Sequence, residues 1–111
     1  MGQFILKIKD EKTNRDYYLE WSTVVDAPVS YGFELEAFRE YYRGEYGESA
    51  MRELPPRLER VEKYGCSVMD SSDTAESLLK SNRAGEKGRR LTKEQILSRY
   101  CRKHLGEPSK R

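Results

Sequence analysis

Hydrophobic and polar residues alternate along two stretches near the start of the chain. In the first, Phe4 to Lys9, hydrophobic residues occupy every second position, and in the second, Tyr17 to Ser22, the same spacing returns. Side chains that alternate in this way point to opposite faces of a β-strand. The polar segment 10–16 between them is typical of a turn, so the pattern predicts an antiparallel β-hairpin. Its buried inner face should consist of Phe4, Leu6, Ile8, Tyr17, Leu19 and Trp21.

Three short segments are further candidates for the same sheet. Residues 23–25 could extend the second strand, which Pro28 should end because proline cannot donate to a sheet's hydrogen bonds. Residues 29–31 form either a short third strand or a loop. Residues 66–69 are apolar enough to add a strand beside the hairpin.

Apolar residues recur at helical spacing in four later segments, which are 34–46, 56–64, 73–84 and 93–105. The last of these has the clearest start signal. Thr92 and Gln95 have the spacing of a capping box, and Leu91 and Ile96 have that of a hydrophobic staple.

These elements together predict an α+β fold, in which a small antiparallel β-hairpin or three-stranded sheet packs one face against three to four short helices. The chain has 111 residues, which suits one domain. We expect that domain to span residues 1–106 and a disordered basic tail to span residues 107–111.

Charge changes the picture, because it is unevenly distributed. Charged residues make up 36% of the chain, against roughly 25% in typical domains. Residues 1–79 carry a net charge of −6, whereas residues 80–111 carry +8. Such asymmetry is typical of proteins that bind nucleic acid or an acidic partner. The alternative is a solvated loop and a charged helix face that contacts the acidic half of the same chain.

Two groups of residues are candidates for binding. The first is basic and would contact phosphate groups or an acidic protein surface: Arg83, Lys87, Arg89 and Arg90. The second is aromatic, because nine of the twelve aromatic residues lie between Tyr17 and Tyr46. Tyr18, Tyr31 and Tyr41 are too many to bury in one small layer, so we expect them to be exposed and to favour a protein partner. The alternative is that these rings fill the junction between sheet and helices.

Residues suited to catalysis are few. Cys66 and Cys101 are the only cysteines and His104 is the only histidine, so we expect no metal site, no disulfide and no cofactor. Cys101 and His104 could share a helix face, but a nucleophilic pair also needs a cleft and an oxyanion donor. No apolar run approaches the 18 residues of a membrane span, and no secretory signal is present, so we expect a cytoplasmic location.

The sequence contains no motif of a known family and predicts a non-catalytic binding protein that contacts another protein, as an inhibitor or adaptor. Small charged domains of phages and other mobile elements offer an analogy of size and composition only. The alternative is a nucleic-acid-associated protein that uses residues 80–111. An enzyme is a third, weaker hypothesis.

Overall fold

The predicted hairpin is confirmed by the computed structural model, which describes residues 3–67 and 75–101. Strand β1 (Gln3–Asp10) pairs antiparallel with β2 (Arg15–Ser22), and Leu6 lies opposite Leu19. A four-residue turn joins them. Asn14 takes a left-handed backbone (φ 59°) there, a conformation that asparagine tolerates better than most residues.

The third strand lies two residues earlier than the segment 29–31 that the sequence favoured. Strand β3 (Ala27–Pro28) pairs with the end of β2, where Pro28 lies opposite Trp21. Proline is tolerated because β3 is an edge strand of the order β1-β2-β3. A separate bridge between Tyr18 and Phe33 continues this edge, and a bridge from Cys66 to Leu6 lies on the other edge, beside β1. Residues 68–69 of the expected strand there are outside the described residues.

The helices follow the sheet in chain order. They are α1 (Leu35–Tyr46), a 3₁₀ turn η1 (Glu48–Arg52), α2 (Leu54–Tyr64), α3 (Ala75–Lys80), a 3₁₀ turn η2 (Glu86–Gly88), α4 (Lys93–Ile96) and a π-helical turn η3 (Leu97–Cys101). The predicted capping box at the start of α4 is confirmed, since Thr92 accepts a hydrogen bond from the Gln95 backbone and the Gln95 side chain accepts one from Thr92. The expected tail 107–111 and the end of the last helix, 102–105, lie outside the described residues.

Helix α3 ends at Lys80, four residues before the predicted end at residue 84. The reason is Asn82, whose buried side chain donates to the carbonyl of Leu79 (2.6 Å). A short polar side chain that binds the backbone nearby competes with helix continuation. Residues 73–74 of the predicted helix are outside the described residues.

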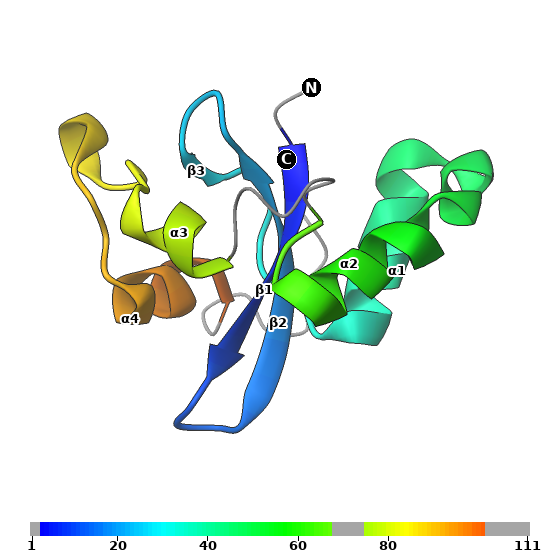
Figure 1. The fold of residues 1–111 in the computed structure, drawn as a ribbon, viewed down its shortest axis with the longest axis horizontal. Coiled ribbons are helices and arrows are strands. Elements are labelled where there is room, and N and C mark those ends of the chain that lie inside the picture. Colours follow the sequence, from blue (N-terminus) through cyan, green and yellow to red (C-terminus); the bar gives the residue numbers. More distant parts are fainter. Residues whose placement is uncertain (1–2, 68–74, 102–111) are drawn as a thin grey trace.

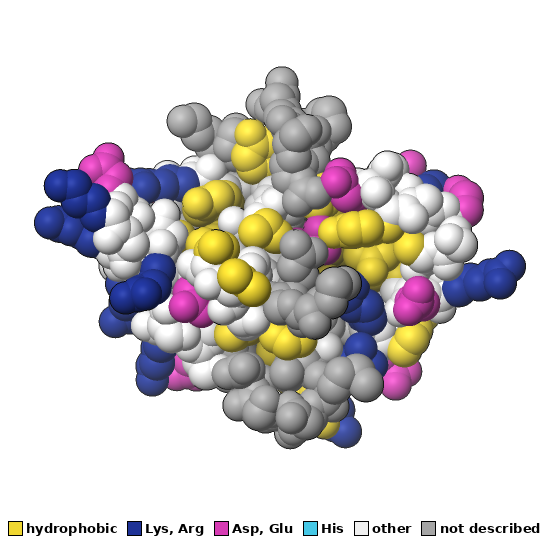
Figure 2. Space-filling view, turned by 90° about the horizontal axis from the view of Figure 1, so that it is seen from above, with side chains coloured by type: hydrophobic (Ala, Val, Ile, Leu, Met, Phe, Trp, Pro, Cys, Tyr) yellow, Lys and Arg dark blue, Asp and Glu magenta, His cyan; other side chains and the backbone are white. Residues whose placement is uncertain are grey.

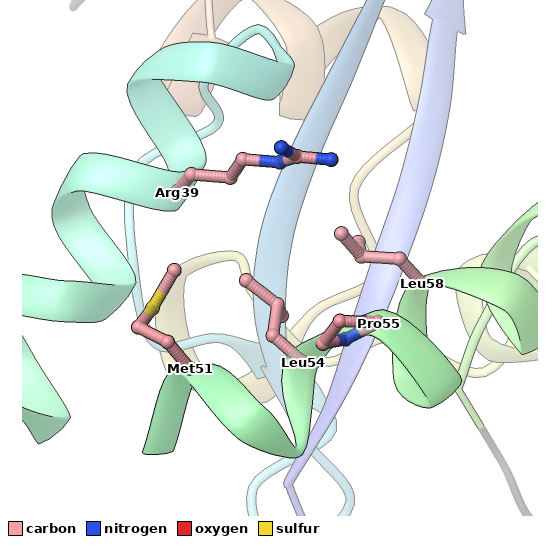
Figure 3. A pocket seen from close by; sticks show the side chains of 5 residues that line it. All are labelled: Arg39, Met51, Leu54, Pro55 and Leu58. Atoms are coloured by element: carbon pink, nitrogen blue, oxygen red, sulfur yellow. The ribbon is translucent and has the colours of Figure 1, made fainter. Parts of the chain in front are cut away.

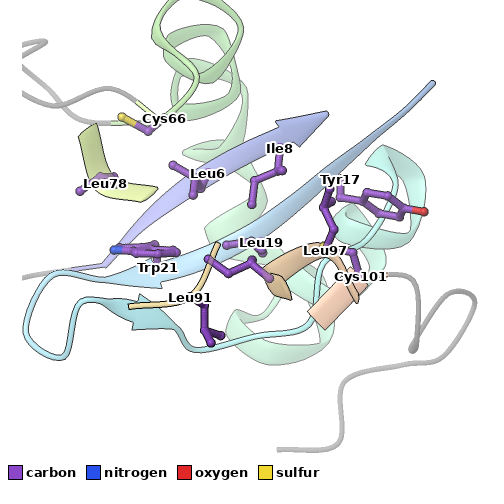
Figure 4. Packing of buried hydrophobic residues seen from close by; sticks show 11 residues of the cluster. Leu6, Ile8, Tyr17, Leu19, Trp21, Cys66, Leu78, Leu91, Leu97 and Cys101 are labelled. Atoms are coloured by element: carbon purple, nitrogen blue, oxygen red, sulfur yellow. The ribbon is translucent and has the colours of Figure 1, made fainter. Parts of the chain in front are cut away.

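The first hydrophobic core lies on the sheet face that the hairpin pattern predicted (Figure 4). Ile8, Tyr17, Leu19 and Trp21 are at most 1% exposed. The segments after residue 74 cover this face with the following buried side chains: Leu78, Leu91, Ile96, Leu97 and Cys101. Of the six residues expected inside, Phe4 alone is half-buried.

Burial of one sheet face only was wrong, because helices cover both faces (Figure 1). Helices α1 and α2 pack on the second face, where Ile5 and Tyr18 join a separate core of Phe33, Phe38, Tyr41, Tyr42, Leu54 and Val61. The alternation predicted a wet face because its side chains are mostly polar. Those polar groups are instead buried with hydrogen-bond partners, which removes most of the cost of burial.

Glu20 shows how a carboxylate is accommodated in that second core. It lies in the middle of β2 and is 1% exposed. Tyr41 donates a hydrogen bond to its Oε1, and Tyr46 donates to both carboxylate oxygens at 2.7 Å. Both phenols come from α1, so the helix that covers this face also supplies the donors that a buried carboxylate needs.

Candidate functional site: a basic loop beside an exposed valine turn

The basic loop, residues 81–91, joins α3 to α4 and is organised by the buried side chain of Asn82. Its Nδ2 donates to the carbonyls of Leu79 (2.6 Å) and Leu91 (2.7 Å). Its Oδ1 accepts from the backbone of Leu91 (2.8 Å) and of Ala84 (3.3 Å). All the capacity of this amide is therefore used to hold the two ends of the loop together.

Within the basic loop, the tip is closed by its own backbone. Gly85 donates to the carbonyl of Arg89 (2.8 Å), and Arg89 donates to that of Glu86 (3.1 Å). A Cβ at Gly85 would lie 2.8 Å from the Arg89 carbonyl oxygen, so this close approach requires glycine. The tip is thus a defined turn.

The four predicted basic residues, Arg83, Lys87, Arg89 and Arg90, are all brought together on this loop and are all exposed. Their side chains make no hydrogen bond or ion pair with any residue that the structure describes. In Figure 2, Lys and Arg side chains gather at the left end of the molecule, where the basic loop lies in Figure 1. The charge is therefore presented to solvent and not neutralised by the acidic half of the chain.

An exposed apolar turn lies beside the basic loop, and the sequence analysis missed it. Residues 23–26, the valine turn, connect β2 to β3, and within it Val24 is 82% exposed and Val25 is 54% exposed. The backbone of Arg83 donates to the carbonyl of Asp26 (2.7 Å), which joins the two segments. Residues 23–25 were expected to extend β2. The overlooked signal was the pair Asp26 and Pro28, which favours a turn directly after the valines.

The predicted exposure of the tyrosines is wrong for two of the three. Tyr18 is 5% exposed and Tyr41 is 8% exposed, while Tyr31 is half-buried. The prediction assumed one covered sheet face, whereas the second core provides room for these rings. Tyr18 and Tyr41 therefore contribute to packing between the sheet and α1, which was the alternative interpretation of this cluster.

Tyr18 takes part in a small polar cluster at the edge of the second core. Its hydroxyl donates to Oε2 of Glu62 (2.7 Å), and Lys7 Nζ donates to Oε1 (2.8 Å). These two bonds, from Lys7 first and Tyr18 second, hold the pKa of Glu62 below its usual value. Burial, followed by the nearby Glu62, raises the pKa of Tyr18 well above its usual range. The cluster connects β1, β2 and α2.

The residues suited to catalysis are not brought into a common cleft by the described part of the structure. Cys66 and Cys101 are free thiols that lie fully buried in the first core. His104 lies outside the described residues. Among residues 3–67 and 75–101 no group of three potential metal ligands occurs, and no helix is long and apolar enough to cross a membrane.

Comparison of the chain with known protein families, with curated proteins and with solved structures finds no match.

Proposed function

We propose that this protein is a non-catalytic binding protein, an inhibitor or adaptor, that contacts an acidic protein surface through the basic loop and the valine turn. The observation that supports it most is their juxtaposition: Val24 and Val25 lie exposed beside four unpaired cations. Exposed aliphatic side chains contribute affinity when a partner covers them, and the surrounding charge increases the association rate and selects an acidic partner. Two free, buried thiols are in keeping with a reducing, cytoplasmic setting.

The structured form of the basic loop strengthens this proposal. A segment that is ordered before binding loses less conformational entropy in the complex. Asn82 provides that order here, because its four hydrogen bonds fix the loop without using any of the exposed cations.

Nucleic-acid binding through residues 80–111 is the second candidate. The four exposed cations could neutralise phosphate groups, with release of counterions. The basic loop itself contains no aromatic residue, so stacking of single-stranded bases has no support there. The exposed valines favour a protein partner over a duplex, since they offer nothing to a phosphate backbone.

A pull-down from native lysate, with and without nuclease, followed by binding kinetics on the purified partner, tests the proposal. One variant replaces Arg83, Lys87, Arg89 and Arg90 with Gln, and another replaces Val24 and Val25 with Ser. The charge variant should slow association, and the valine variant should speed dissociation. A matched control removes four exposed charges elsewhere: Lys9, Lys12, Arg52 and Lys63.

The second candidate predicts a different result in the same experiment. Material captured by the wild type should then disappear with nuclease, and affinity for generic duplex should fall with salt by about one unit of slope per lost contact in the charge variant. Binding that the valine variant leaves unchanged would contradict the proposed protein interface.

A further inference from the structure

A pocket of about 140 Å³ opens between α1, η1 and α2, on the side of the sheet opposite the basic loop (Figures 1 and 3). Four apolar residues and one arginine line it: Arg39, Met51, Leu54, Pro55 and Leu58. Figure 3 shows Arg39 extending from α1 across the opening toward α2, with the apolar side chains on the other walls. The site thus combines one apolar compartment with one cation at its rim.

The apolar part of the pocket is continuous with the second core. Leu54 is 2% exposed, and Met51 and Leu58 are partly buried against the same cluster. An apolar cavity of about 150 Å³ is large enough to hold benzene. The compartment therefore accommodates a single branched aliphatic or phenyl side chain, and Met51 can adjust its shape to either.

Arg39 differs from its neighbours on the same helix pair because it has no hydrogen bond or ion pair with a described residue. By contrast, Arg43 pairs with Glu40 and with Glu48 (2.9 Å), and Arg57 donates to the Tyr42 hydroxyl (2.7 Å). An exposed guanidinium offers a planar pair of donors that matches a carboxylate. Its position at the rim places that carboxylate within one residue of the group in the pocket.

We propose that this pocket binds the C-terminal residue of a partner peptide, with a Leu or Phe side chain among Met51, Leu54 and Leu58 and the terminal carboxylate on Arg39. Charge complementarity and the single-residue size of the compartment carry this assignment. The site is independent of the proposed function above, because it lies on the other face of the sheet and uses none of the same residues.

Titration with N-acetyl-leucine tests the proposal, followed by NMR of methyl-labelled methionine. The chain has three methionines, so the Met51 methyl reports on the pocket while Met1 and Met69 serve as internal references. A ligand this small should bind with a Kd of about 1–10 mM. N-acetyl-leucinamide, which has the same side chain and no carboxylate, should bind about tenfold more weakly.

Two variants separate the pocket from general surface charge. Arg39→Gln, an exposed change that should not affect folding, should lower the affinity for N-acetyl-leucine about tenfold, to the level of the amide. Arg52→Gln removes a nearby exposed charge and should change nothing. Equal affinity for acid and amide, an Arg39→Gln variant that binds like the wild type, or no shift of the Met51 methyl would each overturn the proposal.

Discussion

On the side of the sheet that α3 and α4 cover, β1 and β2 contribute Leu6, Ile8 and Leu19, whereas on the side that α1 and α2 cover they contribute Ile5, Tyr18 and Glu20. The first core is mainly aliphatic, with Trp21 as its largest side chain. The second is built from aromatic rings with tilted contacts, such as Phe33 on Tyr41 at 5.4 Å between centroids. One hairpin therefore supports two cores of different chemistry.

The comparison teaches that polarity in a strand does not determine its exposure. Tyr18 and Glu20 alternate with the aliphatic positions, yet both are buried, because their polar atoms have partners in Glu62 and Tyr41. A one-faced sheet would leave Tyr18 wet, while a two-faced sheet needs partners from the covering helices. Helices α1 and α2 supply them.

The largest expected effect comes from the aliphatic core. Replacement of Trp21 by Ala should lower the free energy of unfolding by about 3–5 kcal/mol, because it removes a fully buried ring from the centre of that core. Trp21→Phe is the matched control. The indole Nε1 has no hydrogen-bond partner among the described residues, so Phe loses volume but no bond and should cost less than Ala. Denaturant unfolding measures both, and a Trp21→Ala cost below about 1 kcal/mol would contradict the assigned core.

The basic loop adds a polar element to this same side of the sheet. Asn82→Ala removes four hydrogen bonds, at about 0.5–1.5 kcal/mol each, and should cost about 2–4 kcal/mol in total. The Leu91 amide should also lose protection from hydrogen exchange. Ser98→Ala, an exposed change near the end of the described chain, should alter stability by no more than about 0.5 kcal/mol. An Asn82→Ala variant with unchanged exchange at Leu91 would show that the loop is held in another way.

Much of the first side could be predicted from the sequence, since its signals are local. The hairpin alternation gave the inner face, and the spacing of Thr92 and Gln95 gave the start of α4. Asn82 was missed because its partners, Leu79 and Leu91, are defined only once the loop has closed. For the basic residues, the sequence indicated the segment, but only the fold shows Arg83 next to the valine turn.

The second side was less predictable because its burial depends on contacts distant in sequence. Tyr18 meets Glu62 across 44 positions, and Tyr41 meets Glu20 across 21. Neither pairing has a local signature in alternation or helical spacing. Composition suggested many exposed tyrosines only because it assumed one covered face, and the second layer of helices removes that assumption.

The polar centre of the second core should be weaker than the aliphatic core but still measurable. Glu20→Ala removes the acceptor of two phenols, Tyr41 and Tyr46, and should cost about 1–3 kcal/mol. Tyr46 is 40% exposed and can bind water instead, which limits the loss. Glu59→Ala, an exposed carboxylate on α2, is the control and should stay within about 0.5 kcal/mol of the wild type. Equal unfolding curves for the two variants would mean that the buried carboxylate is not supported by its phenols.

The smallest effect concerns Glu62 at the edge of the second core, and it depends on pH. Its pKa in the folded protein is lowered because Lys7 and then Tyr18 donate to the ionised form. The stabilisation is therefore complete above the ordinary pKa of 4.5 and is lost as the pH falls through the lowered value. The Glu62 side chain is 55% exposed, so Glu62→Gln should cost only about 0.2–1 kcal/mol at neutral pH. Denaturant unfolding of the wild type and of Glu62→Gln across acid pH should show the two curves converging as the carboxylate becomes protonated, while Glu59→Gln, on the same helix, should show no such convergence. A difference that persists unchanged into strong acid would assign the effect to packing and not to the charge on Glu62.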